Sequence, residues 1–98
     1  MSKVITEKEF RKEVLGSKEK VLVDFYADWC GPCRMLGPIM DEVSEKYHVY
    51  KINVDHDSSL AQEYGIMSIP CVICFKEGKE VERLVGLHSK SEILDLLK

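Results

Sequence analysis

The feature that most constrains the fold is the segment Val21–Ala27, which reads Val-Leu-Val-Asp-Phe-Tyr-Ala. Apolar side chains occupy both alternating positions, so a β-strand formed here is covered on both faces. Such a strand needs a layer of helices on either side of its sheet. The chain has 98 residues, of which 45% are hydrophobic, and this is enough for one well-filled core. We therefore expect a single α/β domain over residues 1–98.

Helices are expected at four places, from apolar residues at helical spacing and from capping residues. The first and last helices begin at capping boxes, in which a Ser or Thr and a Glu three residues later satisfy each other's backbone N–H groups. These pairs are Thr6 with Glu9 and Ser89 with Glu92. The second helix begins near Cys30, and one face of it carries Leu36, Ile39, Met40, Val43 and Tyr47.

The other helix boundaries follow from glycines and small polar residues. The first helix is expected to end near Gly16, and a short third helix runs from Asp57 or Ser58 to Gly65. The last helix is expected to bury Ile93, Leu94 and Leu97.

Further strands are expected at Val49–Val54, Cys71–Phe75 and Glu80–Val85. The tight turn Glu77-Gly78-Lys79 makes the last two an antiparallel pair. The pattern predicts a mixed sheet with helices on both faces.

Charge and hydropathy exclude several classes of partner. The formal net charge is only -3, so the chain lacks the basic field that binds nucleic acid or an anionic membrane surface. No segment approaches the roughly 18 apolar residues of a membrane helix, and Met1–Arg11 lacks the apolar run of a signal peptide. We expect a cytoplasmic protein, in which the four cysteines serve redox or metal chemistry rather than structural disulfides.

Two cysteines, Cys30 and Cys33, lie at the expected start of the second helix in the motif Trp-Cys-Gly-Pro-Cys. Residues three apart in a first helical turn lie on one side of it, close enough for a disulfide. The free N–H groups and the dipole of the helix start stabilise a thiolate at Cys30. Cys33, one turn deeper, is expected to be less exposed and less acidic. This asymmetry predicts that Cys30 attacks a disulfide and that Cys33 resolves the resulting mixed disulfide.

A single C-x-x-C motif is also half of a zinc site. The strand-to-helix context favours the dithiol, and the three histidines, His48, His56 and His88, lack metal-ligand spacing. We therefore expect no bound metal.

Several separated segments resemble the thioredoxin family. They are Trp29–Cys33 behind Val23–Ala27, Ile69-Pro70 before a late strand, and Val85-Gly86 before the last helix. The likeness runs in register over nearly the whole chain. It implies the thioredoxin fold, a mixed five-stranded sheet flanked by four helices.

The resemblance also implies a general protein disulfide reductase that works by dithiol–disulfide exchange through Cys30 and Cys33. Such a protein is an electron carrier: it reduces disulfide-containing protein substrates and is recycled by a separate thioredoxin reductase linked to NADPH or ferredoxin. No cofactor binds the chain itself, and a monomer is the expected state.

Asp24 is an acid in the middle of the apolar strand, where desolvation is expected to raise its pKa. The resemblance assigns it the deprotonation of Cys33, through water; the alternative is a structural hydrogen bond or ion pair. Lys51, central in the next strand, resembles the family lysine near that acid. Its alternative is a lysine that reaches solvent at a strand edge.

The resemblance further implies a cis peptide bond before Pro70 and a flat apolar rim around Cys30 that binds extended substrate segments. The rim residues are Trp29, Gly31, Pro32, Ile69, Pro70, Val85 and Gly86. Without the resemblance, Ile69 and Val85 would be assigned to the core and Gly86 to a turn.

A second C-x-x-C, Cys71 to Cys74, departs from the family pattern, which has a threonine after the cis-proline. On a strand, residues three apart point to opposite faces, so these thiols cannot converge on one ion or bridge each other. We interpret them as small buried hydrophobes. The sharper hypothesis is that Cys71 lies near the dithiol and modulates it.

Two other classes of function are alternatives to the oxidoreductase. A metal-binding module would protect all four thiols with zinc, and a non-catalytic interaction subunit would keep its role without Cys30 and Cys33. Within the oxidoreductase class, a glutaredoxin-like activity is second, because the Gly-Pro dipeptide and Trp29 resemble the reducing thioredoxins.

Overall fold

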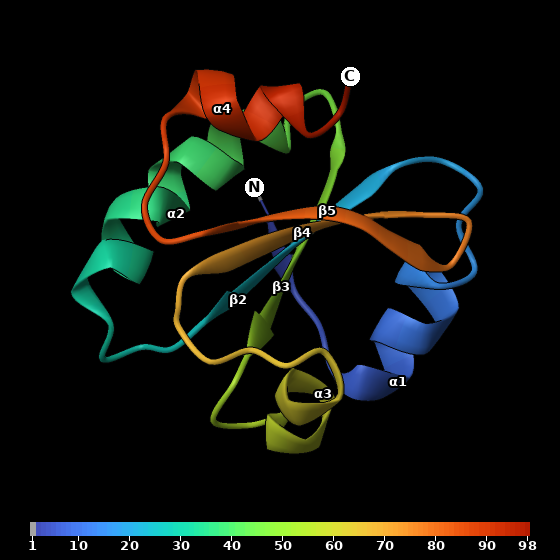
Figure 1. The fold of residues 1–98 in the computed structure, drawn as a ribbon, viewed down its shortest axis with the longest axis horizontal. Coiled ribbons are helices and arrows are strands. Elements are labelled where there is room, and N and C mark those ends of the chain that lie inside the picture. The colour runs from blue at the N-terminus through green and yellow to red at the C-terminus, as the bar shows by residue number, and fades with distance from the viewer. Residues whose placement is uncertain (1) are drawn as a thin grey trace.

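The structure is a computed structural model that describes residues 2–98. Strands and helices alternate along the chain until a final hairpin and a closing helix (Figure 1). The elements are β1 (Lys3–Val4), α1 (Glu7–Glu9), η1 (Phe10–Val14), β2 (Val21–Tyr26), α2 (Gly31–Val43), β3 (His48–Asn53), α3 (Ser58–Glu63), β4 (Cys71–Lys76), β5 (Lys79–Val85) and α4 (Lys90–Asp95).

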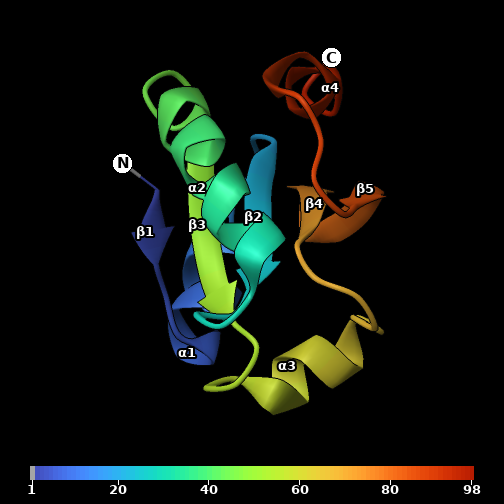
Figure 2. The same cartoon turned by 90° about the vertical axis from the view of Figure 1, so that its left-hand side faces the viewer.

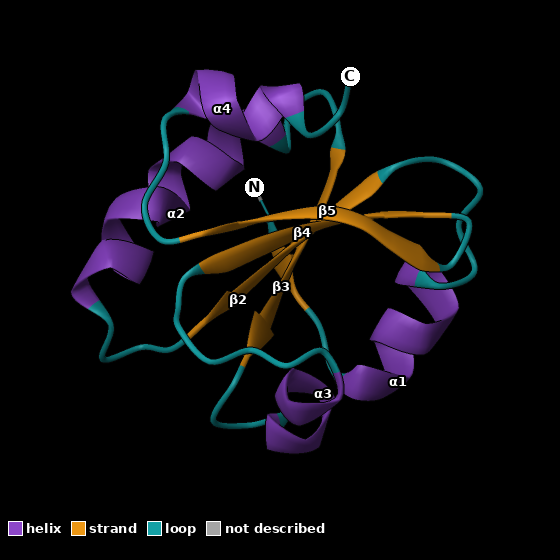
Figure 3. Ribbon diagram, viewed as in Figure 1, coloured by secondary structure: helices purple, strands orange, loops and turns teal. Residues whose placement is uncertain are grey.

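The five strands form one mixed sheet in the order β1-β3-β2-β4-β5, with β2 at its centre. β2 pairs in parallel with β3 and antiparallel with β4, and β4 pairs antiparallel with β5. Figure 3 shows the strong twist of this sheet, in which β5 crosses the direction of β3. The predicted mixed sheet is confirmed. The edge strand β1 was not predicted from the sequence. It has only two residues, Lys3 and Val4, and both are exposed, so they form no apolar pattern.

Helices cover both faces of the sheet, as the pattern of β2 predicts. Figures 1 and 2 show α2 and α4 on one face and α1 and α3 on the other. Side chains of β2 alternate between the two cores. Val21, Val23 and Phe25 pack with Phe10 and Leu60 on the α1/α3 face. On the other face, Leu22 packs with the α2 and α4 residues Leu36, Met40 and Ile93.

The first helix begins at the predicted capping box of Thr6 and Glu9. It then widens into the π-helical segment η1, where the Leu15 N–H reaches back five residues to the Phe10 carbonyl (3.1 Å). Phe10 packs edge-on against Tyr64 and Phe75, with ring centroids 5.6 and 5.4 Å away. These contacts fasten the first helix to α3 and to β4.

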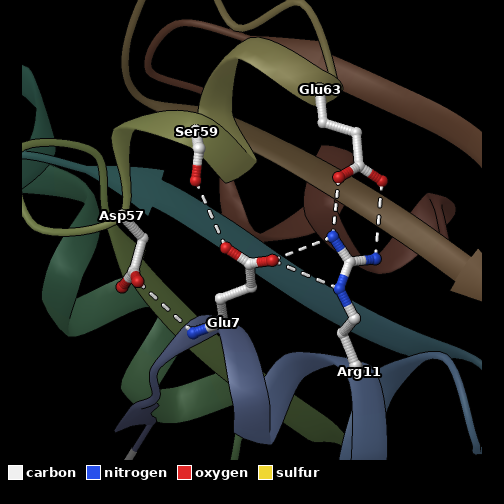
Figure 4. Close-up of polar contacts among 5 residues, drawn as sticks. All are labelled: Glu7, Arg11, Asp57, Ser59 and Glu63. Carbon is white, nitrogen blue, oxygen red and sulfur yellow. Dashed lines mark hydrogen bonds and ion pairs between the residues drawn. The ribbon is translucent and has the colours of Figure 1, made fainter.

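Polar side chains also join this helix to α3 (Figure 4). Arg11 pairs with Glu7 on its own helix (3.0 Å) and with Glu63 on α3 (2.7 Å). Asp57 precedes α3 but makes no capping bond to it; its carboxylate accepts from the Glu7 N–H instead (3.4 Å). The predicted start of α3 is confirmed, while the Asp57 side chain serves the neighbouring helix.

Two core predictions need correction. Tyr47 lies beyond the end of α2 and is exposed, because the chain turns after Val43 toward β3. Ile93 in α4 and Leu96, which caps its C-terminus, are the buried residues, whereas Leu94 and Leu97 are half-buried. The Leu96 N–H bonds the Ile93 carbonyl three residues back (3.1 Å), and this tight last turn brings both side chains onto one face.

Candidate active site

The cysteine pair lies at the start of α2, the helix that follows the central strand β2. Cys30 is the N-cap of α2, with extended backbone, and Pro32 lies in the first turn. Cys30 and Cys33 form a disulfide with their Cα atoms 5.2 Å apart. The Cys30 Sγ also accepts a hydrogen bond from the Cys33 N–H (3.2 Å). The helix start therefore places a donor on the Cys30 sulfur, where it favours negative charge.

The expected difference in exposure between the two cysteines is almost absent in this disulfide form. Cys30 is 4% exposed and Cys33 is 3% exposed. Residue exposure is nearly equal because Ala27, Tyr26, Val54 and Ile69 pack around both. What separates them is position: Cys30 lies before the first turn of α2 and Cys33 within it.

The loop before β4 lies against the dithiol. The Ile69-Pro70 peptide bond is cis, as the resemblance implied. The Ile69 carbonyl lies 3.8 Å from the Cys30 Sγ. The Pro70 carbonyl accepts from the Gly86 N–H (2.7 Å), and Gly86 has φ +92°, which glycine adopts without strain. Two segments far apart in sequence are thus joined beside Cys30.

Asp24 is completely buried in β2, and neither carboxylate oxygen has a hydrogen-bond partner among residues 2–98. It faces the α2 side of the sheet, between Leu22, which packs under α2, and Tyr26, which packs against the dithiol cluster. Burial raises the pKa of Asp24 to about 7, and the charge of Lys51 opposes this rise. The raised pKa that the sequence predicted is confirmed.

Lys51 is the register partner of Asp24 on the neighbouring strand. It is half-buried, and its ammonium lies 4.3 Å from the centre of the Tyr26 ring. A groove beside Cys33 is lined by Tyr26 and Lys51, by Ala27 and Asp28 after β2, and by the α2 residues Cys33, Arg34 and Gly37. Lys51 thus reaches solvent along a groove that also borders the second cysteine.

Only some of the predicted rim residues are exposed at the surface. Trp29 is 68% exposed, and its indole N–H donates to the Asp55 carboxylate (2.9 Å). Gly31, Pro32 and Val85 are exposed, Ile69 and Gly86 are half-buried, and Pro70 is buried. Pro70 therefore shapes the rim from beneath.

Three residues near the site were not singled out from the sequence. Asp55 fixes the Trp29 indole, and Met67, two residues before Ile69, is 94% exposed. His88 bonds the carbonyl of the rim residue Val85 (2.9 Å) and the Glu92 carboxylate (3.1 Å). The one signal for His88 was the capping box, which places Glu92 one helical turn after it.

The second pair, Cys71 and Cys74, is free and buried on β4. Cys71 belongs to the core on the α1/α3 face and Cys74 to the core on the α2/α4 face, as the strand alternation predicted. Burial raises the pKa of both thiols. The Cys71 side chain faces away from the side of the sheet that carries α2, which favours its interpretation as a buried hydrophobe.

Among residues 2–98 no three His, Cys, Asp or Glu side chains come together in an arrangement that could hold a metal ion. Within the same range, every helix is too short or too polar to cross a membrane.

Comparison with known proteins agrees with this geometry. The thioredoxin family model matches residues 1–98. A thioredoxin of Rickettsia felis is 46% identical, over 97% of this chain and 94% of its own. Thioredoxin 1 of Synechococcus elongatus is 44% identical, over 95% of this chain and 91% of its own.

Solved structures give the same result. A mutant thioredoxin from Halobacterium salinarum superposes with a TM-score of 0.89 at 38% identity, covering 98% of this chain and 86% of its own. A thioredoxin from Malassezia sympodialis superposes with a TM-score of 0.85 at 34% identity, covering 98% and 88%. With a bonded cysteine pair at the helix start, a cis-proline loop against it and this likeness over its whole length, the chain belongs to the thioredoxin family.

Proposed function

We propose that the chain is a general protein disulfide reductase whose Cys30–Cys33 pair passes two electrons to a disulfide in another protein. The observation that carries this proposal is the bonded cysteine pair at the N-cap of α2, with the Cys33 N–H donating to the Cys30 Sγ. Family membership supports the same exchange reaction.

In the first step the reduced Cys30 attacks as a thiolate. Its sulfur bonds one sulfur of the substrate disulfide, and the other substrate sulfur leaves as a thiolate that takes a proton from water. The N-cap position supports this step, because the helix start and the Cys33 N–H stabilise the negative sulfur.

In the second step Cys33 frees the captured substrate. Its thiol loses a proton, its sulfur bonds the Cys30 Sγ, and the remaining substrate sulfur leaves as a thiolate. We assign the Cys33 proton to Asp24, because a carboxyl with a pKa of about 7 accepts and returns a proton near neutral pH. Lys51, paired in register with Asp24, tunes this acid through its charge.

Docking is proposed at the rim formed by Trp29, Gly31, Pro32, Ile69, Pro70, Val85 and Gly86. Extended substrate segments gain affinity there from apolar contact and main-chain hydrogen bonds, without strict sequence preference.

The oxidised pair returns to the dithiol by exchange with a thioredoxin reductase, and the chain acts as a monomer formed by one domain over residues 1–98. The cytoplasm is the proposed compartment, because it keeps thiols such as Cys71 and Cys74 reduced.

The test is reduction of insulin disulfides with dithiothreitol as electron source. Cys30→Ser is expected to reduce turnover to the rate of dithiothreitol alone, because no attacking sulfur remains. Reduced Cys33→Ser, mixed with insulin after the dithiothreitol has been removed, is expected to accumulate a mixed disulfide between Cys30 and an insulin chain, visible on a non-reducing gel and by mass spectrometry.

Cys74→Ser, a change at a buried thiol outside the site, is the matched control and is expected to keep turnover. Wild-type turnover no faster than dithiothreitol alone, or trapping by Cys30→Ser instead of Cys33→Ser, contradicts the proposal.

A further inference from the structure

His88 occupies the short connection between β5 and α4, next to the rim. Its side chain is 25% exposed. One ring nitrogen, Nε2, lies 2.9 Å from the Val85 carbonyl oxygen, and the other, Nδ1, lies 3.1 Å from a Glu92 carboxylate oxygen. The imidazole thus bridges the last residue of β5 and the first turn of α4.

Both partners of the ring are hydrogen-bond acceptors. A carbonyl oxygen only accepts, and so does an ionised carboxylate. The Ser89 N–H first, and then His88, lower the pKa of Glu92, so this group is ionised at neutral pH. Only the imidazolium carries an N–H on each nitrogen, so deprotonation removes one of the two bonds in either tautomer.

The segment Val85–Leu87 starts at the end of β5, where Val85 is in register with Cys71 on β4, and it is held at two further points. The Gly86 N–H donates to the Pro70 carbonyl (2.7 Å), which ties the segment to the loop beside Cys30. His88 ties the same segment to α4 through the Val85 carbonyl. Val85 and Leu87 themselves are exposed, with no burial to fix them.

We propose that the His88 imidazolium is a positioning group that holds Val85–Leu87 in its docking conformation, and that loss of its proton loosens this part of the rim. The inference rests on the proposed function, since docking of a protein substrate is what the rim performs. The hydrogen bond to Glu92 first, and then the one to Val85, raise the pKa of His88. The imidazolium and both of its hydrogen bonds therefore persist to a higher pH.

Charged groups on α4 and α2 are engaged with each other. Lys90 on α4 pairs with Glu42 on α2 (3.2 Å), and this pair spans the two helices beside the connection. The Ser89 hydroxyl and N–H bond the second oxygen of Glu92. Asp24 on β2 also titrates near neutral pH, but it lies in the core and is expected to act on the chemical step.

The experiment compares wild type with His88→Gln, which keeps one donor for the Val85 carbonyl and does not titrate. KM and kcat for insulin, with dithiothreitol as reductant, are measured from pH 6 to pH 9. We expect the wild-type KM to rise several-fold as His88 loses its proton, and the His88→Gln KM to stay flat. The kcat profile, set by Asp24 and the cysteines, stays the same in both.

His48→Gln is the matched control. His48 also pairs with a carboxylate, Glu19 (2.7 Å), but it starts β3 at the end of the strand away from the dithiol. This variant is expected to keep the wild-type KM profile.

NMR of the oxidised protein, without substrate, tests the bridge separately. We expect two protonated ring nitrogens at pH 6, and Gly86 and Leu87 amide signals that follow the His88 titration. A wild-type KM profile retained in His88→Gln, or amides that ignore that titration, overturns the proposal even if insulin is reduced. Absence of insulin reduction at every pH instead removes the proposed function and the docking role with it.

Discussion

The carboxyl group of Asp24 lies in the core, and residues 2–98 provide no hydrogen-bond donor for either oxygen. Its ionised form is therefore opposed by burial and supported chiefly by the nearby charge of Lys51. An acid placed like this costs stability whenever it is ionised. That cost is the reason why its pKa reaches the neutral range, as the proposed proton exchange with Cys33 requires.

The effect of Asp24 on stability has a definite sign. Its pKa is about 7 in the folded chain, against an ordinary aspartate value of 3.8 when the chain is unfolded, so between these values the folded state binds the extra proton. The contribution of this group to stability is fully present below pH 3.8 and is lost as pH rises toward 7.

We expect the free energy of unfolding of wild type, relative to Asp24→Asn, to fall by on the order of 4 kcal/mol between pH 4 and pH 8. Urea denaturation of the oxidised proteins at several pH values measures this fall in the free energy of unfolding. Asp28→Asn, at an exposed position near the same site, controls for the loss of a carboxylate. A difference between wild type and Asp24→Asn that is independent of pH would contradict the assignment.

At the scale of elements, two glycines end helices for different reasons. Gly65 follows α3 with φ +62°, a left-handed conformation, and has open space where a Cβ would lie. Gly16 follows η1 with ordinary φ, but a Cβ there would collide with the Lys12 carbonyl oxygen. The first position requires glycine for its backbone angle and the second for space.

These reasons predict opposite responses to asparagine, which tolerates the left-handed region better than alanine does. Gly65→Ala is expected to lower stability by about 1 kcal/mol, and Gly65→Asn to recover part of it. Gly16→Ala is expected to lower stability by about 1–3 kcal/mol, and Gly16→Asn by at least as much. Urea denaturation measures all four, and an asparagine rescue at Gly16 would be inconsistent with the collision.

Over the whole molecule, two cores share the two faces of one sheet. Phe10 lies in the core on the α1/α3 face, and Met40 lies in the core on the α2/α4 face. Every residue of β4 from Cys71 to Phe75 is buried, and their side chains alternate between the two cores. Loss of either core would leave one side of the central strands exposed to water.

Two cores that share one sheet predict one unfolding transition in which both melt together. Phe10→Ala is expected to lower the free energy of unfolding by about 3–5 kcal/mol, and Met40→Ala by about 2–5 kcal/mol. Tryptophan fluorescence and far-ultraviolet circular dichroism should give the same urea midpoint in each variant. Separate midpoints for the two probes would indicate two units.

Local features were predictable because their causes lie within a few neighbouring residues. The capping boxes at Thr6 and Ser89 formed as expected, and the buried run at Val21–Ala27 became the central strand. The Cys30–Cys33 pair needed only helical spacing and a helix start to meet. Asp24 could be identified because an acid within an apolar strand has no other place than the core.

Tertiary structure decided whatever depends on segments distant in sequence. The edge strand β1 exists because two exposed residues pair with β3, Lys3 with Tyr50 and Val4 with Lys51. The nearly equal burial of Cys30 and Cys33 comes from Ile69 and its neighbours, and the two bonds of His88 depend on how the end of β5 meets α4. Periodicity and capping depend on contacts within one helical turn or one strand. Contacts between distant segments form only when the helices on both faces pack against the sheet.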